Sequence, residues 1–262
     1  DLIYYMTPFE YFDSNNYEFN PESRDGVYII HGFTNTTYET RDLAKYLGDQ
    51  GFNTVANNLP GHGTTAEDCN RCKFTDWIDF VEQGVAAISS RCDNVYVIGI
   101  SMGSVLALHL SSVFPLNAAV FAATVLQFKD FIGTRVLTPI FHKIIPFREK
   151  KLSYPIKIRD TFHYLGYPVW PMSAVNEMRK LTNKVKKELH LVSTPALIIQ
   201  SEKDILQLPS NTPLVYNSIS SEIKEKLFVK NANHNLFVSS PDQDIIFQKI
   251  TSFFNQFKNH KK

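Results

Sequence analysis

The stretch NVYVIGISMGSVLALHL, residues 94–110, decides the fold. Residues 94–100 are a short apolar run rich in β-branched side chains, which is typical of a buried strand. Residues 104–110 contain no proline or glycine and are apolar on more than one side, which predicts a buried helix. The stretch therefore predicts a strand, a tight turn and a helix, with Ser101 at the apex of the turn.

The turn has the form G-x-S-x-G over residues 99–103. Glycines on both sides of Ser101 let neighbouring backbone approach where a Cβ atom would clash. The serine side chain is then exposed at the end of the strand and next to a helix N-terminus, where the N–H of Met102 can point at an oxyanion. This arrangement favours a nucleophilic serine.

Length and composition place the chain among ordinary globular proteins. Its 262 residues are enough for one large α/β domain, and the formal net charge of +1 gives no indication of nucleic-acid binding. No apolar run approaches the roughly 20 residues of a membrane span, and no secretory signal is visible. Three cysteines argue against a disulfide framework and favour a reducing compartment, so we expect a cytoplasmic protein.

Apolar strand-like runs alternate with helical patterns through most of the chain, and this alternation breaks between residues 126 and 191. Strands that alternate with helices predict a mostly parallel sheet with helices on both faces. We therefore predict an α/β core formed by residues 1–125 and 192–262, with a small inserted cap at residues 126–191. Near the start of the core, Thr36 and Glu39 have the spacing of a capping box, which predicts a helix start.

A serine becomes a strong nucleophile only when a base takes its proton, and that base is usually a histidine oriented by a carboxylate. Among the histidines after Ser101, His234 is the one that follows the last predicted strand at the catalytic edge of the sheet. We predict that His234 is the base, the alternative being a surface loop histidine. Asp204 follows the preceding strand and is the predicted acid, with Glu202 as its rival.

Two backbone N–H groups are expected to receive the oxyanion. One belongs to Met102, and the other should come from the loop after the first long strand, which reads His31-Gly32-Phe33. Gly32 permits close approach and Phe33 supplies the N–H. We expect His31 to shape the loop rather than to take part in the chemistry.

Together these motifs resemble the bacterial carboxylesterase and monoacylglycerol lipase group of the α/β-hydrolase superfamily. The resemblance runs from about residue 26 onward and is carried by residues 31–34, 61–65, 76–77, 99–103, 167–169 and 195–204. It implies an α/β-hydrolase fold and hydrolysis of a small-molecule ester through an acyl-enzyme, without metal or cofactor. Short- to medium-chain acyl esters and monoacylglycerols are the substrates implied.

The chain departs from the pattern of this group at several positions. Ser104 stands where another glycine is frequent, and Asn35 replaces a frequent glycine beside the oxyanion loop. Asn233 and Asn235 make the surroundings of His234 more polar than usual. None of these changes removes a member of the predicted triad, but Asn35 is expected to alter the oxyanion loop.

The predicted cap supplies three candidate substrate-binding residues. Tyr167 and Trp170 are expected to line an apolar acyl pocket, the alternative being that they only pack the cap. Asp160 is expected to accept hydrogen bonds from a polar alcohol such as glycerol, unless it is a surface carboxylate. Basic residues next to apolar ones between residues 143 and 159 indicate either a weak contact with an anionic lipid surface or a solvated face.

Cys69 and Cys72 form a C-x-x-C pair, which is found in redox and zinc sites. Zinc needs two further ligands, and the sequence offers no nearby Cys/His pair, so we predict free thiols.

Fold alone does not determine function. The same triad could hydrolyse an amide or a carbon–carbon bond, and the same fold could bind a ligand while retaining only slow turnover. The residue pattern leaves these alternatives, the acyl length and the oligomeric state open.

Overall fold

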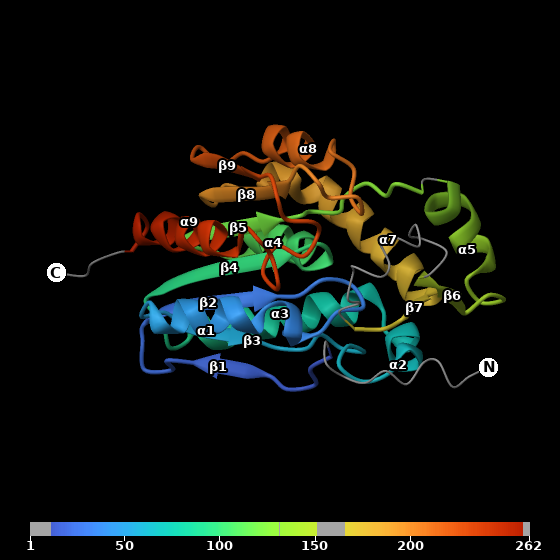
Figure 1. Ribbon diagram of the computed structural model, residues 1–262, viewed down its shortest axis with the longest axis horizontal. Coiled ribbons are helices and arrows are strands. Elements are labelled where there is room, and N and C mark those ends of the chain that lie inside the picture. Colours follow the sequence, from blue (N-terminus) through green and yellow to red (C-terminus); the bar gives the residue numbers. More distant parts are fainter. Residues whose placement is uncertain (1–11, 131, 151–165, 259–262) are drawn as a thin grey trace.

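The computed structural model describes residues 12–130, 132–150 and 166–258. Within them, a seven-stranded sheet has the strand order β1-β3-β2-β4-β5-β8-β9 (Figure 1). All neighbouring strands are parallel except β1, which runs antiparallel to β3. The strands are β1 Tyr17–Phe19, β2 Asp25–Ile30, β3 Asn53–Ala56, β4 Asn94–Ile100, β5 Ala118–Ala122, β8 Ala196–Ser201 and β9 Lys224–Val229. The predicted mostly parallel sheet is confirmed.

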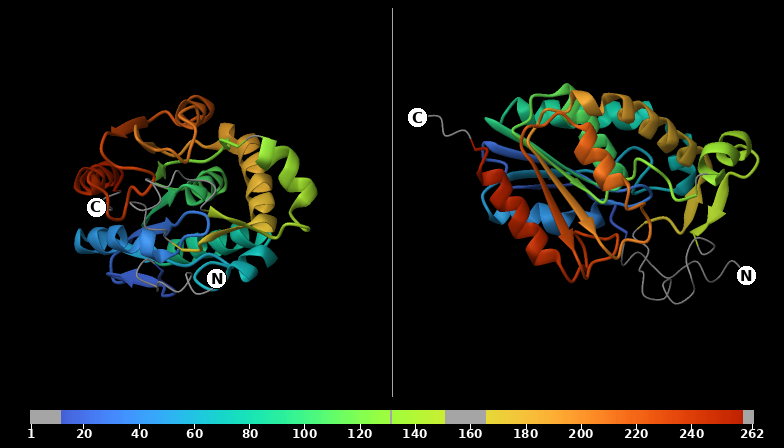
Figure 2. Two further views of the ribbon diagram at one scale, coloured as in Figure 1. Left: turned by 45° about the vertical axis from the view of Figure 1, so that its right-hand side comes forward. Right: turned by 90° about the horizontal axis from the view of Figure 1, so that it is seen from above.

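Helices cover both faces of the sheet, as expected for parallel strands (Figure 2). One face carries α1 and α9, and the opposite face carries α3, α4 and α7. Their bounds are α1 Arg41–Asp49, α3 Phe74–Ser89, α4 Met102–Val113, α7 Met172–Glu188 and α9 Gln243–Asn255. This is the α/β-hydrolase fold that the sequence predicts.

Strand β4 lies in the middle of the sheet and is buried along its whole length. Val95 and Val97 belong to the core beneath α3 and α4, whereas Tyr96, Ile98 and Ile100 belong to the core beneath α1 and α9. Burial on both faces explains why the sequence of this strand is a continuous apolar run instead of an alternating one. Each such side chain contributes about 1.5–3 kcal/mol when fully buried.

Two glycines let α4 start directly after β4. A Cβ atom on Gly99 would lie 2.1 Å from the carbonyl oxygen of Gly103, and one on Gly103 would lie 2.2 Å from the carbonyl oxygen of Ile30. Both contacts are with backbone, which cannot move aside as the end of a flexible side chain can. The glycines therefore fix the close approach of α4 to β2 and place Ser101 between them.

The predicted capping box at Thr36 and Glu39 is wrong. The Thr36 hydroxyl accepts a hydrogen bond from the N–H of Tyr38 and caps a single 3₁₀ turn, η2 Thr37–Glu39, and α1 begins only at Arg41. The Glu39 carboxylate points away from this cap and accepts hydrogen bonds from the loop that precedes η2. The spacing of the two residues is right for a cap, but a buried loop competes for the carboxylate.

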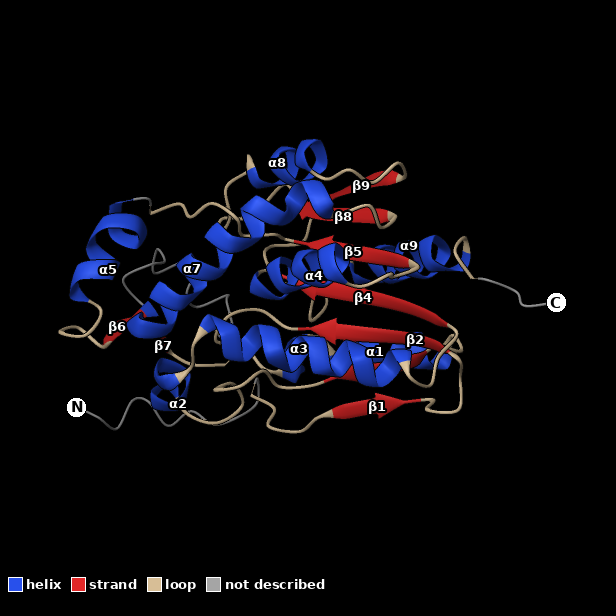
Figure 3. Ribbon diagram, turned by 180° about the vertical axis from the view of Figure 1, so that it is seen from behind, coloured by secondary structure: helices blue, strands red, loops and turns tan. Residues whose placement is uncertain are grey.

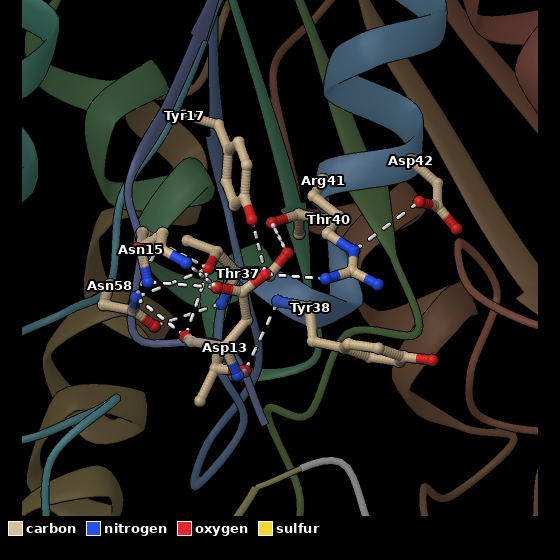
Figure 4. Close-up of polar contacts among 10 residues, drawn as sticks. Asp13, Asn15, Tyr17, Thr37, Tyr38, Thr40, Arg41, Asp42 and Asn58 are labelled. Atoms are coloured by element: carbon tan, nitrogen blue, oxygen red, sulfur yellow. Dashed lines mark hydrogen bonds and ion pairs between the residues drawn. The ribbon is translucent and has the colours of Figure 1, made fainter. Parts of the chain in front are cut away.

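A polar cluster around Asp13 anchors the segment before β1 to this region (Figure 4). The Asp13 carboxylate accepts hydrogen bonds from the Tyr17 hydroxyl at 2.6 Å and from Arg41 Nη1 at 2.7 Å. Burial raises the pKa of Asp13, but these donors and Asn15 outweigh it and lower the pKa below its ordinary value. Since the N–H of Asp13 also donates to Thr36 Oγ1, the cluster fixes the start of η2.

The described elements between β5 and β8 are η3 Gly133–Leu137, α5 Thr138–Phe141, β6 Phe147–Glu149, β7 Val169–Pro171, α7 and η5 Leu189–Leu191. The elements α5, β6 and β7 and the start of α7 lie at the end of the molecule toward which the parallel strands point, and α7 runs from there back over the sheet (Figure 3). Strands β6 and β7 form a separate antiparallel pair. We propose that residues 126–191 form the predicted cap over this edge. No helix in the described ranges is long and apolar enough to cross a membrane.

Candidate active site

Ser101 occupies the turn between β4 and α4. Its φ of +57° and ψ of −115° lie outside the regions that non-glycine residues ordinarily adopt. Such strain persists only where the surroundings impose it, and it is typical of the sharp strand-to-helix turn that presents a nucleophile. The N–H of Ser101 donates to the carbonyl oxygen of Ala122 at 2.9 Å, which ties the turn to the end of β5.

His234 and Asp204 come from the loops after β9 and β8 and form a hydrogen-bonded pair. His234 Nδ1 lies 2.7 Å from Asp204 Oδ2, and the Asp204 side chain is fully buried. The other carboxylate oxygen accepts from the N–H groups of Leu206 at 2.8 Å and Gln207 at 3.3 Å. A proton on Nδ1 leaves Nε2 as the imidazole nitrogen that can accept a proton.

Charge and burial act against each other in this pair. Burial raises the pKa of Asp204, but the charge and hydrogen bond of His234 outweigh it and hold the pKa below its usual value. Burial lowers the pKa of His234, but the hydrogen-bonded Asp204 and the more distant carboxylate of Glu39 raise it above 6.5. The pair is thus arranged to stabilise an imidazolium beside a carboxylate.

Asp242 fixes the loop that carries His234. Its carboxylate accepts from the N–H groups of Asn231 at 2.7 Å and Ala232 at 2.8 Å, and the carbonyl oxygen of Ala232 accepts from the Ser201 hydroxyl. Sequence reasoning missed Asp242, because nothing in the local pattern indicates that it reaches back ten residues.

Ser101 and His234 line one cavity of about 370 Å³, which also reaches Phe33 and Trp170. Its apolar lining comes from the segment after β5, from β7 and α7, and from the loop after Asp204. The Trp170 ring stacks on Phe33 with 6.1 Å between centroids and 7° between planes. Trp170 therefore lines the cavity, and its contact with substrate stays a prediction.

The predicted oxyanion donors belong to two segments that meet at Ser101. A Cβ atom built on Gly32 would lie 3.1 Å from the Cβ of Ser101, which places the loop of residues 32–35 against the nucleophile. Within the described part of the chain, the N–H groups of Phe33 and Met102 donate to no protein acceptor. Both are therefore available to a developing oxyanion.

His31 is buried below this loop. Its Nε2 accepts from the N–H of Leu59 at 3.0 Å, so its Nδ1 carries the proton and donates to the carbonyl oxygen of Gly32 at 2.8 Å. Burial lowers the pKa of His31 to about 4, so the ring is neutral near pH 7. His31 shapes the loop, as expected from the sequence.

Two further expectations for the cap concern Tyr167 and Asp160. Tyr167 is not among the described residues that line the cavity. It is buried, its hydroxyl donates to the carbonyl oxygen of Gly61 at 2.8 Å, and it accepts from the N–H of Thr64 at 3.1 Å. The structure thus places Tyr167 as a support for the loop at residues 61–64, and its contact with substrate stays a prediction. Asp160 lies outside the described residues.

Glu39 and Lys150 are site residues that sequence reasoning missed. Lys150 lines the cavity although it is only 4% exposed, and its Nζ donates to Thr34 Oγ1 at 2.7 Å. Burial lowers the pKa of Lys150 to about 7. In the sequence Lys150 is one of many basic residues in its stretch, and no local signal distinguishes it.

Cys69 and Cys72 are free thiols in the structure. Burial raises the pKa of both, so the reactive thiolate form is disfavoured. No group of three or more metal-ligating side chains occurs in the part of the chain that the structure describes.

Comparisons with known proteins agree with this geometry. Residues 21–241 match the model of the family described as serine aminopeptidase, S33. The chain is 30% identical over 236 residues to the thermostable monoacylglycerol lipase of Bacillus sp. (strain H-257), covering 87% of this chain and 90% of that protein. It is 20% identical over 231 residues to the carboxylesterase of Bacillus subtilis (strain 168), covering 88% and 92%.

A solved structure from work on LipS and LipT, two metagenome-derived lipolytic enzymes, is similar in sequence and fold. It has a TM-score of 0.81 and 26% identity, over 93% of this chain and 98% of that chain. A serine at a strained strand-to-helix turn of a mostly parallel sheet defines an α/β-hydrolase. The chain belongs to the serine aminopeptidase S33 family, and it is a serine hydrolase. The resemblance to the bacterial carboxylesterase and monoacylglycerol lipase group is confirmed.

Proposed function

We propose that the protein is a carboxylic ester hydrolase that acts through an acyl-enzyme on short- to medium-chain acyl esters, monoacylglycerols included. The observation that carries the proposal is that Ser101 and the Asp204-bound imidazole of His234 line one largely apolar cavity. The names of the bacterial relatives, a monoacylglycerol lipase and a carboxylesterase, support the ester as substrate.

The reaction follows from the positions of the groups. Ser101 Oγ attacks the ester carbonyl while His234 Nε2 takes the hydroxyl proton, and Asp204 stabilises the imidazolium that forms. The N–H groups of Phe33 and Met102 bind the oxyanion of the tetrahedral intermediate. Collapse of the intermediate breaks the bond to the alcohol, which leaves with the proton from Nε2. Water then attacks the acyl-enzyme by the same steps and releases the acid.

The cavity lining fits an acyl chain. Its apolar lining includes Val125, Phe128 and Trp170, together with Val175 and Met178 from α7. A volume of about 370 Å³ is at the small end of the range for ligand pockets, which favours short to medium chains over long ones.

Amide hydrolysis is the second candidate, because the family model takes its description from an aminopeptidase. Comparison of p-nitrophenyl octanoate with octanoyl p-nitroanilide separates the two, since the acyl group is the same and the released p-nitrophenolate and p-nitroaniline can both be followed by their absorbance. We expect kcat/KM to be at least about 100-fold higher for the ester, because p-nitrophenolate leaves without protonation, whereas the anilide nitrogen must first take a proton from His234. Preference for the anilide would identify an amidase, and one acyl transfer per protein without turnover would identify a binding protein.

We expect kcat/KM to fall at acid pH with a midpoint above 6.5, because a protonated His234 cannot accept the Ser101 proton. The sign follows from the direction of the pKa shift, since a raised pKa means that the inactive imidazolium persists to higher pH. Measurement from about pH 5 to about pH 9 gives the midpoint. A rate that does not change over this range would show that His234 is not the base.

We also propose a weak contact of the cap with anionic lipid surfaces. The segment formed by η3 and α5 turns Thr134 and Thr138 toward the cavity. Large apolar side chains of the same segment and the turn after it are exposed to solvent, namely Ile132, Val136, Leu137, Ile140, Phe141, Ile144 and Ile145. An apolar surface next to the exposed basic residue Arg148 is typical of interfacial contact.

Substitution of both Ile140 and Ile144 by serine is expected to weaken cosedimentation with phosphatidylglycerol vesicles at least about tenfold, from the loss of two apolar side chains. Val113→Ser, at the end of α4 away from Ser101 and outside η3 and α5, replaces another exposed apolar residue and is the matched control. If wild type, the double variant and Val113→Ser bind the vesicles equally, the proposed membrane contact is wrong. A cytoplasmic location remains a proposal that rests on the cysteine content.

A further inference from the structure

We infer that Glu39 is a positioning residue of the active site. It holds the oxyanion loop, residues 32–35, in the conformation that leaves the Phe33 N–H free for the oxyanion, and its negative charge stabilises the His234 imidazolium. The inference rests on the proposed function, because that function assigns the Phe33 N–H to the oxyanion.

The Glu39 carboxylate clamps the two ends of the oxyanion loop. Its side chain is fully buried; Oε2 accepts from the N–H of Gly32 at 2.6 Å, and Oε1 accepts from Asn35 Nδ2 at 2.6 Å. The N–H of Asn35 also donates to the carbonyl oxygen of Gly32 at 3.2 Å and closes the turn. Because the Gly32 N–H is engaged by Glu39, the next N–H along the loop, that of Phe33, is the one left for the oxyanion.

The loop needs such a clamp because its backbone is strained. Thr34 has φ of +62°, a left-handed conformation that a β-branched residue rarely adopts and that costs of order 1–3 kcal/mol. On the opposite side of the loop, Lys150 Nζ donates to Thr34 Oγ1 at 2.7 Å, and the N–H of Tyr167 donates to the Thr34 carbonyl oxygen at 3.0 Å. Glu39 reaches the loop from within the core, as does His31 through the carbonyl oxygen of Gly32.

Asn35 and Glu39 act as a pair. Asn35 is one of the departures from the related esterases, in which glycine is frequent at this position. A glycine there would leave Oε1 of Glu39 without its donor, whereas the Asn35 amide supplies it. The altered loop residue and the buried carboxylate therefore belong to one arrangement.

The charge of Glu39 also reaches the catalytic base. In the described part of the chain, the titratable groups that face Glu39 are His234, from the loop after β9, and Lys150, at the end of β6. Burial raises the pKa of Glu39 and outweighs the hydrogen bonds from Asn35 and Gly32, so the pKa lies above its ordinary value. Since both carboxylate oxygens accept hydrogen bonds, the geometry fits the ionised form. A carboxylate here adds to Asp204 in stabilising the His234 imidazolium.

Glu39→Gln is the sharpest test, because it preserves the size of the side chain and removes its charge. The glutamine NH₂ must face either the Gly32 N–H, where one donor meets another, or the Asn35 side chain, whose amide must then turn over to present Oδ1. We expect kcat on p-nitrophenyl octanoate to fall about 10- to 100-fold with KM changed less than about threefold, since the oxyanion contact is made only in the transition state. The acid midpoint of kcat/KM is expected to move to lower pH.

The double variant Asn35→Asp with Glu39→Gln is the matched rescue. An aspartate at position 35 accepts from the glutamine NH₂, while the glutamine oxygen still accepts from the Gly32 N–H. We expect kcat to recover to within about threefold of wild type, because the hydrogen-bond pattern around the loop is restored with the donor and acceptor exchanged. A merely structural role of Glu39 would show as a lower unfolding temperature without these changes in kcat and in the pH profile.

Two results would overturn the inference. Either Glu39→Gln keeps the wild-type kcat and acid midpoint, or the double variant is no better than the single one. Failure of the proposed function shows differently, because wild type itself would then not hydrolyse the ester. In that case the rate at which a fluorophosphonate labels Ser101, whose Oγ displaces fluoride from phosphorus, still tests the loop in wild type and Glu39→Gln.

Discussion

Replacing Ser101 with alanine is expected to lower kcat for p-nitrophenyl esters by about 10⁶-fold, the size of effect seen when a serine nucleophile is removed. The reason is that His234 then has no hydroxyl to deprotonate, so no acyl-enzyme can form. A residual rate above that of the buffer is expected from the oxyanion donors alone. Initial rates at saturating ester, with the variant prepared on fresh columns, measure the effect.

Ser112→Ala is the matched control for this variant. Ser112 lies on the same helix, α4, and its hydroxyl donates to the carbonyl oxygen of His109 instead of facing the cavity. We expect it to keep kcat within about twofold of wild type, as surface substitutions away from functional features usually do. If Ser101→Ala retains more than about one per cent of the wild-type rate, another group is the nucleophile.

Asp204→Asn is expected to lower kcat by about 10⁴-fold while the protein remains folded. The asparagine NH₂ would face His234 Nδ1, which now lies 2.7 Å from a carboxylate oxygen. This favours the tautomer that is protonated on Nε2, and that tautomer cannot accept the Ser101 proton. The variant also loses the charge that stabilises the imidazolium.

Glu202→Gln provides the control for Asp204 and settles the rivalry between the two acids. Glu202 is exposed and lies in the same loop, two residues before Asp204, but Asp204 is the residue that hydrogen-bonds the imidazole. We expect wild-type kcat for Glu202→Gln. A large loss in Glu202→Gln with a small one in Asp204→Asn would mean that the acid has been assigned to the wrong residue.

The sheet and the nucleophile turn were predictable because their signals are local. Residues 94–110 contain an apolar strand, the two glycines of the turn and a helix within one short stretch. The glycines at positions 99 and 103 are needed because a Cβ atom at either would clash with adjacent backbone, so their spacing predicts the tight turn. His234 and Asp204 could be chosen because parallel strands bring their carboxyl ends to one edge of the sheet.

The remaining site residues depend on contacts between distant segments. Lys150 meets Thr34 across more than a hundred residues of sequence, and Tyr167 reaches Gly61 across a similar span. Nothing in the local sequence of either residue indicates its partner. Glu39 does carry a local signal, the spacing of a capping box. Its carboxylate instead accepts hydrogen bonds from the Gly32 N–H and the Asn35 amide in the nearby buried loop.

The central claim is that Ser101 carries the acyl group during ester hydrolysis, and mass spectrometry of the acid-quenched enzyme tests it most directly. Wild type and Ser101→Ala are mixed with p-nitrophenyl butyrate, quenched within the first turnover and digested. The account predicts that part of the wild-type protein is heavier by one butyryl group in place of a hydrogen, located on Ser101, and that the variant is unmodified. Butyryl on another residue, or turnover without any acylated protein, would contradict it.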